Sequence, residues 1–147
     1  MSRNPISLLL VLVQSLMLTV LFLSGPVVPT TLLSGIFFLI GFLLLFWAFW
    51  TMRTSTFQIT PDLAPGSILV TNGPYSFTRH PMYGGIMLIS ISLLLNSFDT
   101  SRLIAVVILF ADLLFKASLE DHYLEKHFGK EYKNYEEKTQ KLIPFIY

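Results

Sequence analysis

The sequence predicts an all-α integral membrane protein, a bundle of about four transmembrane helices followed by a C-terminal amphipathic helix. Of its 147 residues, 53% are apolar and only 13% are charged, whereas a soluble domain is about 25% charged. No charged residue occurs between Arg3 and Arg53, and twelve of the nineteen charges lie between Lys116 and Lys141. The chain therefore changes from apolar to polar along its length.

The same composition excludes several classes of protein. A chain this apolar is neither a soluble globular domain nor an intrinsically disordered segment. A formal net charge of +1 is too small for a nucleic-acid-binding surface, which needs a basic stripe. The absence of cysteine excludes disulfides, cysteine-ligated zinc and thiol nucleophiles. Because no cluster of ligands has metal-binding spacing, we also expect no metal site.

Four apolar segments are candidates to cross the bilayer, which takes about 20 mostly apolar residues per helix. They are 6–23, 31–52, 83–95 and 103–115. The first ends at Ser24-Gly25-Pro26, where proline stops a helix, and a cleaved signal peptide is its alternative. The second carries Trp47 and Trp50 near its end, as in an interfacial belt. The last two are short, so a buried or re-entrant hairpin is the alternative for them.

The distribution of lysine and arginine predicts the orientation of these spans. With four spans, both termini and the loop between the second and third helices share one side of the membrane. Nine of the ten basic residues lie on that side, and only Arg102 lies on the other, which favours cytoplasmic termini. We expect residues 1–52 to form two N-terminal spans and residues 53–147 to form a functional core at the cytoplasmic face.

The loop before the third span is dense in residues with special backbone properties. Asn72-Gly73-Pro74 predicts a turn, and Pro81 fits the first position of a helix, where its missing N–H is no loss. The N–H groups of Met82, Tyr83 and Gly84 would then point out of the helix start, which suits a carboxylate or phosphate. An ordinary helix start with an interfacial arginine and tyrosine is the alternative.

The fourth span carries a line of charges. Asp112, Lys116 and Glu120 are spaced by four residues and therefore share one helix face. A charge at the depth of Asp112 usually faces a protein interior or a cavity, and Lys116 lies one turn from either acid. A structural ladder of ion pairs at the membrane surface is the alternative to a functional site.

The segment 120–135 has the pattern of an amphipathic helix. Its aromatic-rich stripe, at spacings near three and four, consists of Tyr123, Leu124, His127, Phe128, Tyr132 and Tyr135. Gly129 is expected to end or bend this helix. Packing on lipid is the simple interpretation of the stripe, and we expect His122 and His127 at the surface.

Two motifs and their spacing resemble a known family. Gly73-Pro-Tyr-Ser-Phe-Thr-Arg-His-Pro-Met-Tyr83 is followed 37 residues later by Glu120-Asp-x-x-Leu-x-x-x-Phe-Gly-Lys-Glu-Tyr-x-x-Tyr135, and then by Leu142-Ile-Pro144. Together they resemble the isoprenylcysteine carboxyl methyltransferase family, which is related to the membrane phospholipid methyltransferases. The similarity covers roughly residues 53–147, which it identifies as a methyltransferase core.

The resemblance implies a multi-pass membrane enzyme that uses S-adenosylmethionine and releases S-adenosylhomocysteine. It implies that the cofactor lies at the cytosolic face between the Arg-His-Pro region and the C-terminal segment. The implied cofactor-binding residues are Ile68, Leu69, Val70, Tyr75, His80, Pro81, Met82, Tyr83 and Glu120. Lys116 falls where the eukaryotic enzymes place a substrate-binding arginine; a lysine keeps the charge but loses the bidentate fork. Asp121 replaces the second glutamate, and Lys138 takes the place of the basic residue after the last tyrosine.

Several functions remain open from the sequence. The first is carboxyl O-methylation of a lipid-like or small amphipathic acid, with Lys116 holding the carboxylate and Arg79 either binding substrate or anchoring its helix. The second is N-methylation of a phospholipid or amine, for which Glu120 or Asp112 would be the base. The third is an NADPH-dependent reductase of the sterol-reductase type, which has a comparable Arg-His-x-x-Tyr helix start. A non-enzymatic membrane adaptor is a fourth possibility.

Overall fold

The computed structural model describes residues 5–53, 66 and 68–142. Throughout these residues the regular structure is helical, so the predicted all-α class is confirmed. The elements are α1 (Pro5–Leu23), α2 (Leu32–Met52), the 3₁₀ helix η1 (Gly73–Ser76), α3 (Pro81–Asn96), α4 (Thr100–Phe128) and α5 (Lys130–Glu136). The expected return of the C-terminal end, with its Ile-Pro pair, lies in 143–147, outside the described residues.

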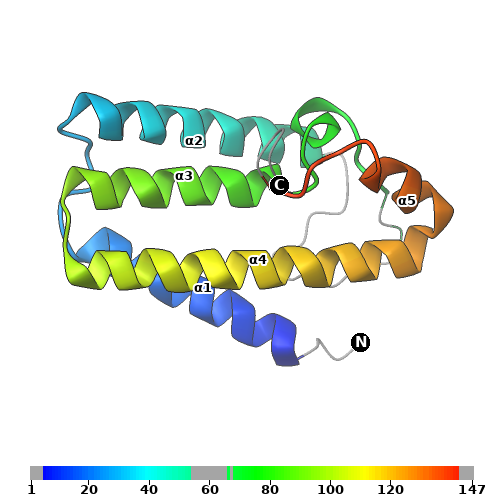
Figure 1. Ribbon diagram of the computed structural model, residues 1–147, viewed down its shortest axis with the longest axis horizontal. Helices are drawn as coiled ribbons and strands as arrows, with labels where there is room; N and C mark the ends of the chain where they lie inside the picture. Colours follow the sequence, from blue (N-terminus) through cyan, green and yellow to red (C-terminus); the bar gives the residue numbers. More distant parts are fainter. Residues whose placement is uncertain (1–4, 54–65, 67, 143–147) are drawn as a thin grey trace.

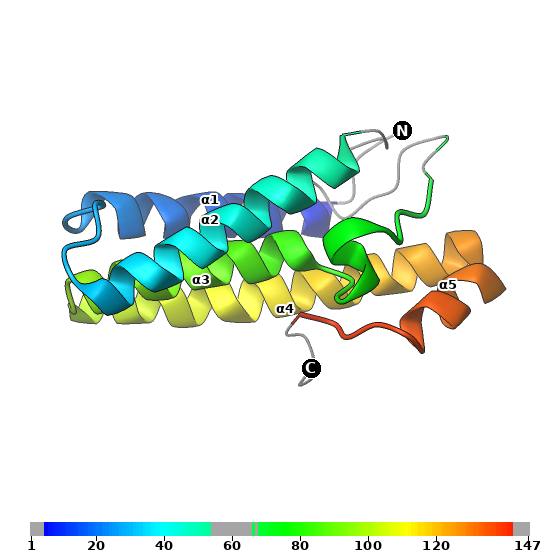
Figure 2. The same cartoon turned by 90° about the horizontal axis from the view of Figure 1, so that it is seen from above.

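The four long helices run alternately up and down, with α2 lying along α3 and α1 along α4 (Figure 1). Figure 2 shows that α2 is inclined to α3 rather than parallel to it. Helices α1 and α2 are long and apolar enough to cross a membrane, and α3 is a shorter apolar helix of 16 residues. The total of four spans stays a prediction, which the side-by-side packing of all four helices favours.

The outer faces of α1 and α2 are apolar and exposed, as lipid contact requires. Leu12 and Leu16 on α1 are each 58% exposed, and Leu43 and Phe46 on α2 are 55% and 56% exposed. In water such a surface would be strongly unfavourable. These helices therefore bury only one side each, and hydrocarbon is the solvent that suits the other side.

Arg102 closes the end of the bundle that lies away from the charged tail. Its side chain is fully buried, and its guanidinium donates to oxygens at the ends of α1 and α3 and in the loop after α1. These acceptors belong to Leu21, Ser24, Pro26, Leu93 and Ser97. The last carbonyls of a helix lack partners within it and carry partial negative charge. One arginine therefore satisfies two helix ends at once.

Two glycines let α2 and α3 approach closely. A Cβ added at Gly41 would lie 2.9 Å from the carbonyl oxygen of Gly85, and one added at Gly85 would lie 3.0 Å from that of Gly41. From this contact α2 continues for 11 residues, about 16 Å, whereas α3 reaches back only four residues, about 6 Å, to Pro81. The start of α3 is consequently recessed by about 10 Å relative to the end of α2.

The loop before α3 fills the space beside the last turns of α2. Gly73 begins η1 with a φ of 60°, and a Cβ there would lie 2.7 Å from Oγ1 of Thr51. The predicted turn at Asn72-Gly73-Pro74 and the start of a helix at Pro81 are both confirmed. This packing carries the chain from the loop down to the recessed start of α3.

The C-terminal amphipathic segment differs from the expectation of a separate helix. Helix α4 continues without interruption for 29 residues, from the apolar span through to Phe128. Gly129, with a φ of 55°, then breaks the helix before α5, as predicted. Tyr132 and Tyr135 of the aromatic stripe are buried, while His122 and His127 are exposed as predicted. The buried tyrosines pack on protein, and the lipid-packing interpretation does not apply to them.

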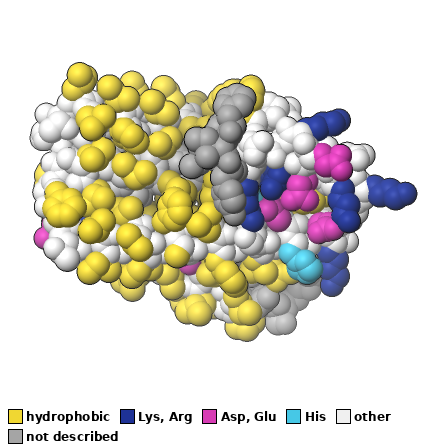
Figure 3. Space-filling view, in the orientation of Figure 1, with side chains coloured by type: hydrophobic (Ala, Val, Ile, Leu, Met, Phe, Trp, Pro, Cys, Tyr) yellow, Lys and Arg dark blue, Asp and Glu magenta, His cyan; other side chains and the backbone are white. Residues whose placement is uncertain are grey.

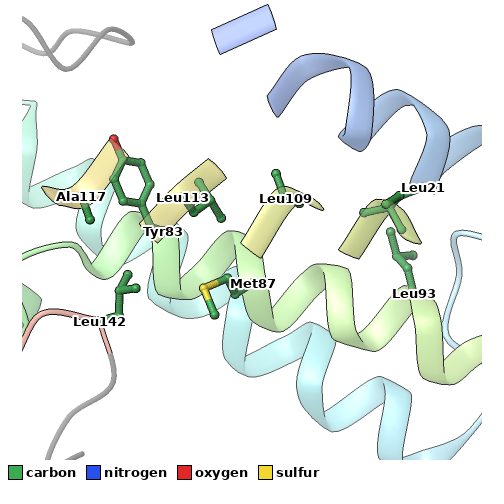
Figure 4. Packing of buried hydrophobic residues seen from close by; sticks show 9 residues of the cluster. Leu21, Tyr83, Met87, Leu93, Leu109, Leu113, Ala117 and Leu142 are labelled. Atoms are coloured by element: carbon green, nitrogen blue, oxygen red, sulfur yellow. The ribbon is translucent and has the colours of Figure 1, made fainter. Parts of the chain in front are cut away.

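A core of apolar residues links α1, α3, α4 and the tail (Figure 4). Its members are Leu21, Tyr83, Met87, Leu93, Ala105, Leu109, Leu113, Ala117 and Leu142. Figure 4 shows Tyr83 at one end of this row, beside Leu142 and Ala117. The core thus ends at the start of α3, where the polar residues begin.

The contact between Gly41 and Gly85 predicts a direction for substitutions in α2. Gly41→Ala should lower the thermal unfolding temperature in detergent, because the added Cβ meets backbone at 2.9 Å; overpacking of this kind costs about 1–3 kcal/mol. Gly35→Ala is the matched control. Its Cβ would meet only Pro29 at 4.0 Å, so the better helix propensity of alanine, up to about 1 kcal/mol, should leave it neutral or stabilising. Equal unfolding temperatures for the two variants would contradict the close approach.

Candidate functional site

Backbone hydrogen bonds bring the tail against the loop before α3. The N–H of Arg79 donates to the carbonyl of Gln140 at 2.8 Å, and the N–H of His80 donates to that of Lys141 at 3.1 Å. In return, the N–H of Gln140 donates to the carbonyl of Phe77 at 3.1 Å. Two segments that are about 60 residues apart in sequence therefore meet at the recessed start of α3.

His80 lies between two consecutive carboxylates of α4. Its Nδ1 is 3.1 Å from Oε2 of Glu120, and its Nε2 is 2.7 Å from Oδ1 of Asp121. Burial alone would lower the pKa of His80, but the hydrogen bonds to Asp121 and Glu120 and their charges outweigh it and raise the pKa. A neutral imidazole has one N–H donor, whereas an imidazolium has two. The protonated form therefore matches both carboxylates.

Asp121 is the centre of the surrounding network. It accepts a hydrogen bond from the hydroxyl of Tyr132 and lies 3.3 Å from Nζ of Lys141 and 3.6 Å from Nε of Arg79. Burial alone would raise the pKa of Asp121. This effect is outweighed by the hydrogen bond and charge of His80, the hydrogen bond from Tyr132 and the charge of Arg79, which together lower the pKa to about 2. Asp121 is thus ionised, and it joins α4, α5, the tail and the loop.

Glu120 has a different environment from its neighbour. Its Oε1 accepts a hydrogen bond from the Tyr83 hydroxyl at 2.5 Å, while Oε2 faces His80. The rings of His80 and Tyr83 are stacked, with their centroids 5.5 Å apart. Tyr83 and His80 therefore hold the Glu120 carboxylate in place. The side chain is still 24% exposed, so a small molecule can reach it.

Lys116 lies next to Tyr83 but is held by a residue of α1. Its side chain is almost fully buried, and its ammonium is 5.2 Å from the centroid of the Tyr83 ring. The ammonium donates to Oε1 of Gln14 at 2.6 Å. The predicted shared face of α4 is present, and the hydrogen bond from Lys116 to Gln14 links this face to α1.

Arg79 is occupied by the tail. Its guanidinium donates to the carbonyls of Thr139, at 2.8 Å, and Glu136, at 3.1 Å, and its side chain is only 10% exposed. These contacts are those of an anchor. Of the two roles left open for Arg79, the geometry favours anchoring over substrate binding.

The start of α3 differs from the expected cradle of three N–H groups. Two of them, those of Tyr83 and Gly84, donate to the carbonyl of His80 at 3.1 and 3.2 Å. The cause is local geometry, because His80 is the N-cap residue and its carbonyl accepts the first helical bonds. Within the described part of the chain, the N–H of Met82 is the one of the three that is left for an anion.

The remaining predicted cofactor residues precede or begin α3, and they differ in how far they are buried. Tyr75 is buried in η1, where its carbonyl accepts a hydrogen bond from the Tyr135 hydroxyl at 2.7 Å. Pro81 is buried at the first position of α3. The three residues of the preceding extended segment are more open: Ile68 is 68% exposed, and Leu69 and Val70 are half-buried. Their contact with a cofactor stays a prediction.

Sequence reasoning missed three residues of this network. The first is Lys141, whose ammonium forms an ion pair with Asp121, whereas Lys138 is exposed. Tyr132 was recognised only as part of an apolar stripe. Gln14 could have been found, since it is the single amide in an otherwise apolar first span. A polar side chain at that depth needs a partner, and Lys116 is the partner.

Charged side chains gather at one end of the molecule, over α5 and the last part of α4, while apolar side chains cover most of the rest of the face in Figure 3. The site lies where these two surfaces meet. The fold and site define a class: a small helical protein with membrane-compatible apolar helices and a network of ionised groups at one end of the bundle.

Comparison with known proteins identifies the family. The profile of the phospholipid methyltransferase family matches residues 29–131, so the chain belongs to that family. It is 33% identical over 82 residues to protein-S-isoprenylcysteine O-methyltransferase B of Arabidopsis thaliana, covering 53% of this chain and 40% of that protein. It is also 33% identical over 81 residues to protein-S-isoprenylcysteine O-methyltransferase of Schizosaccharomyces pombe, covering 54% and 34%.

These relatives confirm the resemblance seen in the two motifs. A probable protein-S-isoprenylcysteine O-methyltransferase of Oryza sativa subsp. indica is 31% identical over 81 residues, covering 53% of this chain and 41% of that protein. The chain thus spans well under half the length of each of these curated relatives. Family membership together with the apolar helices indicates a membrane protein.

The position of His80 predicts how stability depends on pH. Because its pKa is raised in the folded protein, it stabilises the fold fully below its ordinary pKa of about 6.5. That stabilisation is lost as the pH rises through the raised value. The unfolding temperature in detergent should therefore fall as the pH rises from about 6.5 through the raised pKa of His80. In His80→Gln the unfolding temperature should depend less on pH over this range.

The exposed His122 provides the control for this measurement. His122→Gln should show the same pH dependence as the unsubstituted protein, since His122 lies on the surface. If His80→Gln kept the full pH dependence, the two carboxylates would not be stabilising an imidazolium.

Proposed function

We propose that this protein is a membrane methyltransferase that transfers a methyl group from S-adenosylmethionine to the carboxylate of a lipid-like, isoprenylcysteine-type or small amphipathic acid. Family membership supports the reaction class. One observation supports the acceptor: the buried ammonium of Lys116 lies beside Tyr83, whose hydroxyl bonds Glu120. A cation that could hold a carboxylate therefore adjoins the residues expected to hold the methyl donor.

The residues present fit S-adenosylmethionine. The partly exposed Glu120 carboxylate, fixed by Tyr83 and His80, suits the ammonium or the ribose hydroxyls. The ring of Tyr75 suits the sulfonium or the adenine, because cations are attracted to ring faces, whereas the ring of Tyr83 is stacked on His80 and adjoins Lys116. The N–H of Met82, at the positive end of α3, suits the carboxylate of the cofactor.

For this reaction the main task of the protein is to align the methyl donor with the acceptor carboxylate. When bound, S-adenosylmethionine supplies an electrophilic methyl carbon, to which an acceptor carboxylate oxygen bonds while the carbon–sulfur bond breaks and its electron pair stays on sulfur. No proton moves, so a carboxylate acceptor needs no general base. Lys116 would hold the carboxylate with its charge, and burial would remove water from it. Alignment of this kind contributes up to about 7–11 kcal/mol in favourable cases.

An apolar cleft between α3 and α4 suits the rest of the acceptor. It has a volume of about 230 Å³ between α3 and α4 and is lined by Met87, Ser90, Ile91, Val106, Val107, Leu109 and Phe110. Met87 follows Tyr83 by one turn, and Leu109 precedes Asp112 by one turn. An apolar tail of an acceptor could occupy this cleft between the two helices that carry Tyr83 and Lys116.

The expected cytoplasmic position of the site remains part of the proposal. The excess of basic residues on the side of both termini supports it. The end of α2 also has the features of a membrane interface on one side or the other, because the guanidinium of Arg53 lies 3.5 Å from the ring centroid of Trp50. Tryptophan and arginine in this position are typical of a membrane interface.

Calorimetric titration of the detergent-purified protein tests the cofactor. S-adenosylhomocysteine should bind and NADPH should not; binding of NADPH alone would instead indicate a reductase. Glu120→Gln should weaken S-adenosylhomocysteine by about tenfold or more, since it removes a charged hydrogen-bond partner. Lys116→Met should leave this affinity within about twofold.

The matched control is Glu125→Gln, a carboxylate on the same helix whose ion pair with Lys133 is exposed. It should bind S-adenosylhomocysteine as the unsubstituted protein does. Equal affinity for Glu120→Gln and Glu125→Gln would remove Glu120 from the cofactor site.

A second candidate function, N-methylation of an amine, is favoured by Asp112. This side chain is 7% exposed, and within the described part of the chain its Oδ2 is buried without a hydrogen-bond partner. An amine acceptor loses a proton during methylation, and a buried carboxylate could accept it. Asp112 would then act as the general base.

Asp112→Asn separates the two functions. With a labelled methyl donor, we expect the label to enter a base-labile ester of S-prenylated N-acetylcysteine, at a rate that Asp112→Asn leaves within about threefold, because O-methylation needs no base. Label in the amine of phosphatidylethanolamine, with a rate about 100-fold lower in Asp112→Asn, would establish N-methylation in its place.

A further inference from the structure

Gln14 is the side chain of α1 that reaches into the site. It is half-buried in the middle of an apolar helix, and an amide placed in hydrocarbon without a partner is unfavourable. Its Oε1 accepts the hydrogen bond from Lys116 at 2.6 Å. On the same helix, Met17, Leu18 and Leu21 belong to or pack against the core that lines α4. The position of Gln14 is therefore set by well-packed neighbours.

A lysine ammonium alone cannot orient a carboxylate. It is a compact point charge whose three donors rotate freely, unlike the planar fork of arginine. The amide of Gln14 changes this, because its Oε1 holds the ammonium while its Nε2, bonded to the same carbon, carries two further donors. An ammonium N–H and an amide N–H are thus placed side by side on two different helices.

We propose that Lys116 and Gln14 together form a two-donor cradle for the acceptor carboxylate. Lys116 supplies the charge and one hydrogen bond, and the Nε2 of Gln14 supplies the second hydrogen bond. Two bonds to the two carboxylate oxygens fix the plane of the group, and this orients one oxygen toward the methyl donor. The inference rests on the proposed O-methylation and adds to it a specificity-determining residue.

The matched part of the family profile begins at residue 29, whereas Gln14 lies in α1 and outside it. The cradle therefore combines a residue of the family core with a residue that the profile match does not cover. Recognition of the acceptor by this chain would then depend on the pairing of α1 with α4.

The test measures methylation of S-prenylated N-acetylcysteine by full-length variants. Gln14→Leu should raise the KM for this acid by about tenfold, the value of one hydrogen bond to a charged group, and should also lower kcat, because the carboxylate oxygen is no longer oriented toward the methyl donor. S-adenosylhomocysteine affinity should not change. Gln14→Glu should raise the KM further, because it neutralises Lys116 and presents no donor in its ionised form.

Rescue distinguishes the cradle from a structural role. In the Gln14→Leu background, Lys116→Arg should restore most of the KM, since a guanidinium supplies both donors alone. Ser15→Ala is the matched control, because the Ser15 hydroxyl donates to the carbonyl of Val11 one turn earlier in its own helix. Its KM should stay at the unsubstituted value.

The outcomes separate this inference from the proposed function. If the unsubstituted protein methylates the acid and Gln14→Leu has the KM of Ser15→Ala, the cradle is wrong and O-methylation stands. If Lys116→Arg does not lower the raised KM of Gln14→Leu, the cradle is also wrong. If the unsubstituted protein binds S-adenosylhomocysteine but neither binds nor methylates the acid, the proposed acceptor class fails, and the cradle fails with it.

Discussion

The interaction on which this site depends is the pair of hydrogen bonds from His80 to Glu120 and Asp121. It joins the start of α3 to α4 and leaves the two acids with different tasks. Asp121 is surrounded by cations and a tyrosine hydroxyl and holds the tail in place. Glu120 keeps an exposed edge. A single buried histidine thus lies between a carboxylate held within the protein and one that keeps a partly exposed side chain.

Much of this arrangement could be predicted from the sequence. The bounds of α1 and α2, the turn at Gly73 and the helix start at Pro81 follow from local rules for apolar length, glycine and proline, which act within a few residues. The extension of α4 through to Phe128 could not be predicted in this way. The change from an apolar span to an amphipathic pattern looks like a boundary between helices, although the backbone has no reason to stop there before Gly129.

The partners within the site were the hardest part to predict. Lys116 seemed directed to the acids one turn away, since residues four apart share a helix face. It also donates a hydrogen bond to Gln14, which is 102 residues distant in sequence. Arg79 likewise meets the carbonyls of the tail, and Lys141 forms an ion pair with Asp121 that no sequence pattern indicated. Such contacts are set by how the helices pack, and one sequence carries no record of packing partners.

The unequal reach of α2 and α3 beyond their glycine contact has a consequence for selectivity. The recessed start of α3 lies about 10 Å short of the end of α2, and with the proposed topology the acceptor would be methylated at the depth of the membrane interface. A water-soluble acid would have to leave its hydration shell to arrive there, whereas an acid that partitions into the membrane is already at that depth and is concentrated in two dimensions. The bilayer itself would then exclude soluble competitors, before any side chain of the protein distinguishes one acceptor from another.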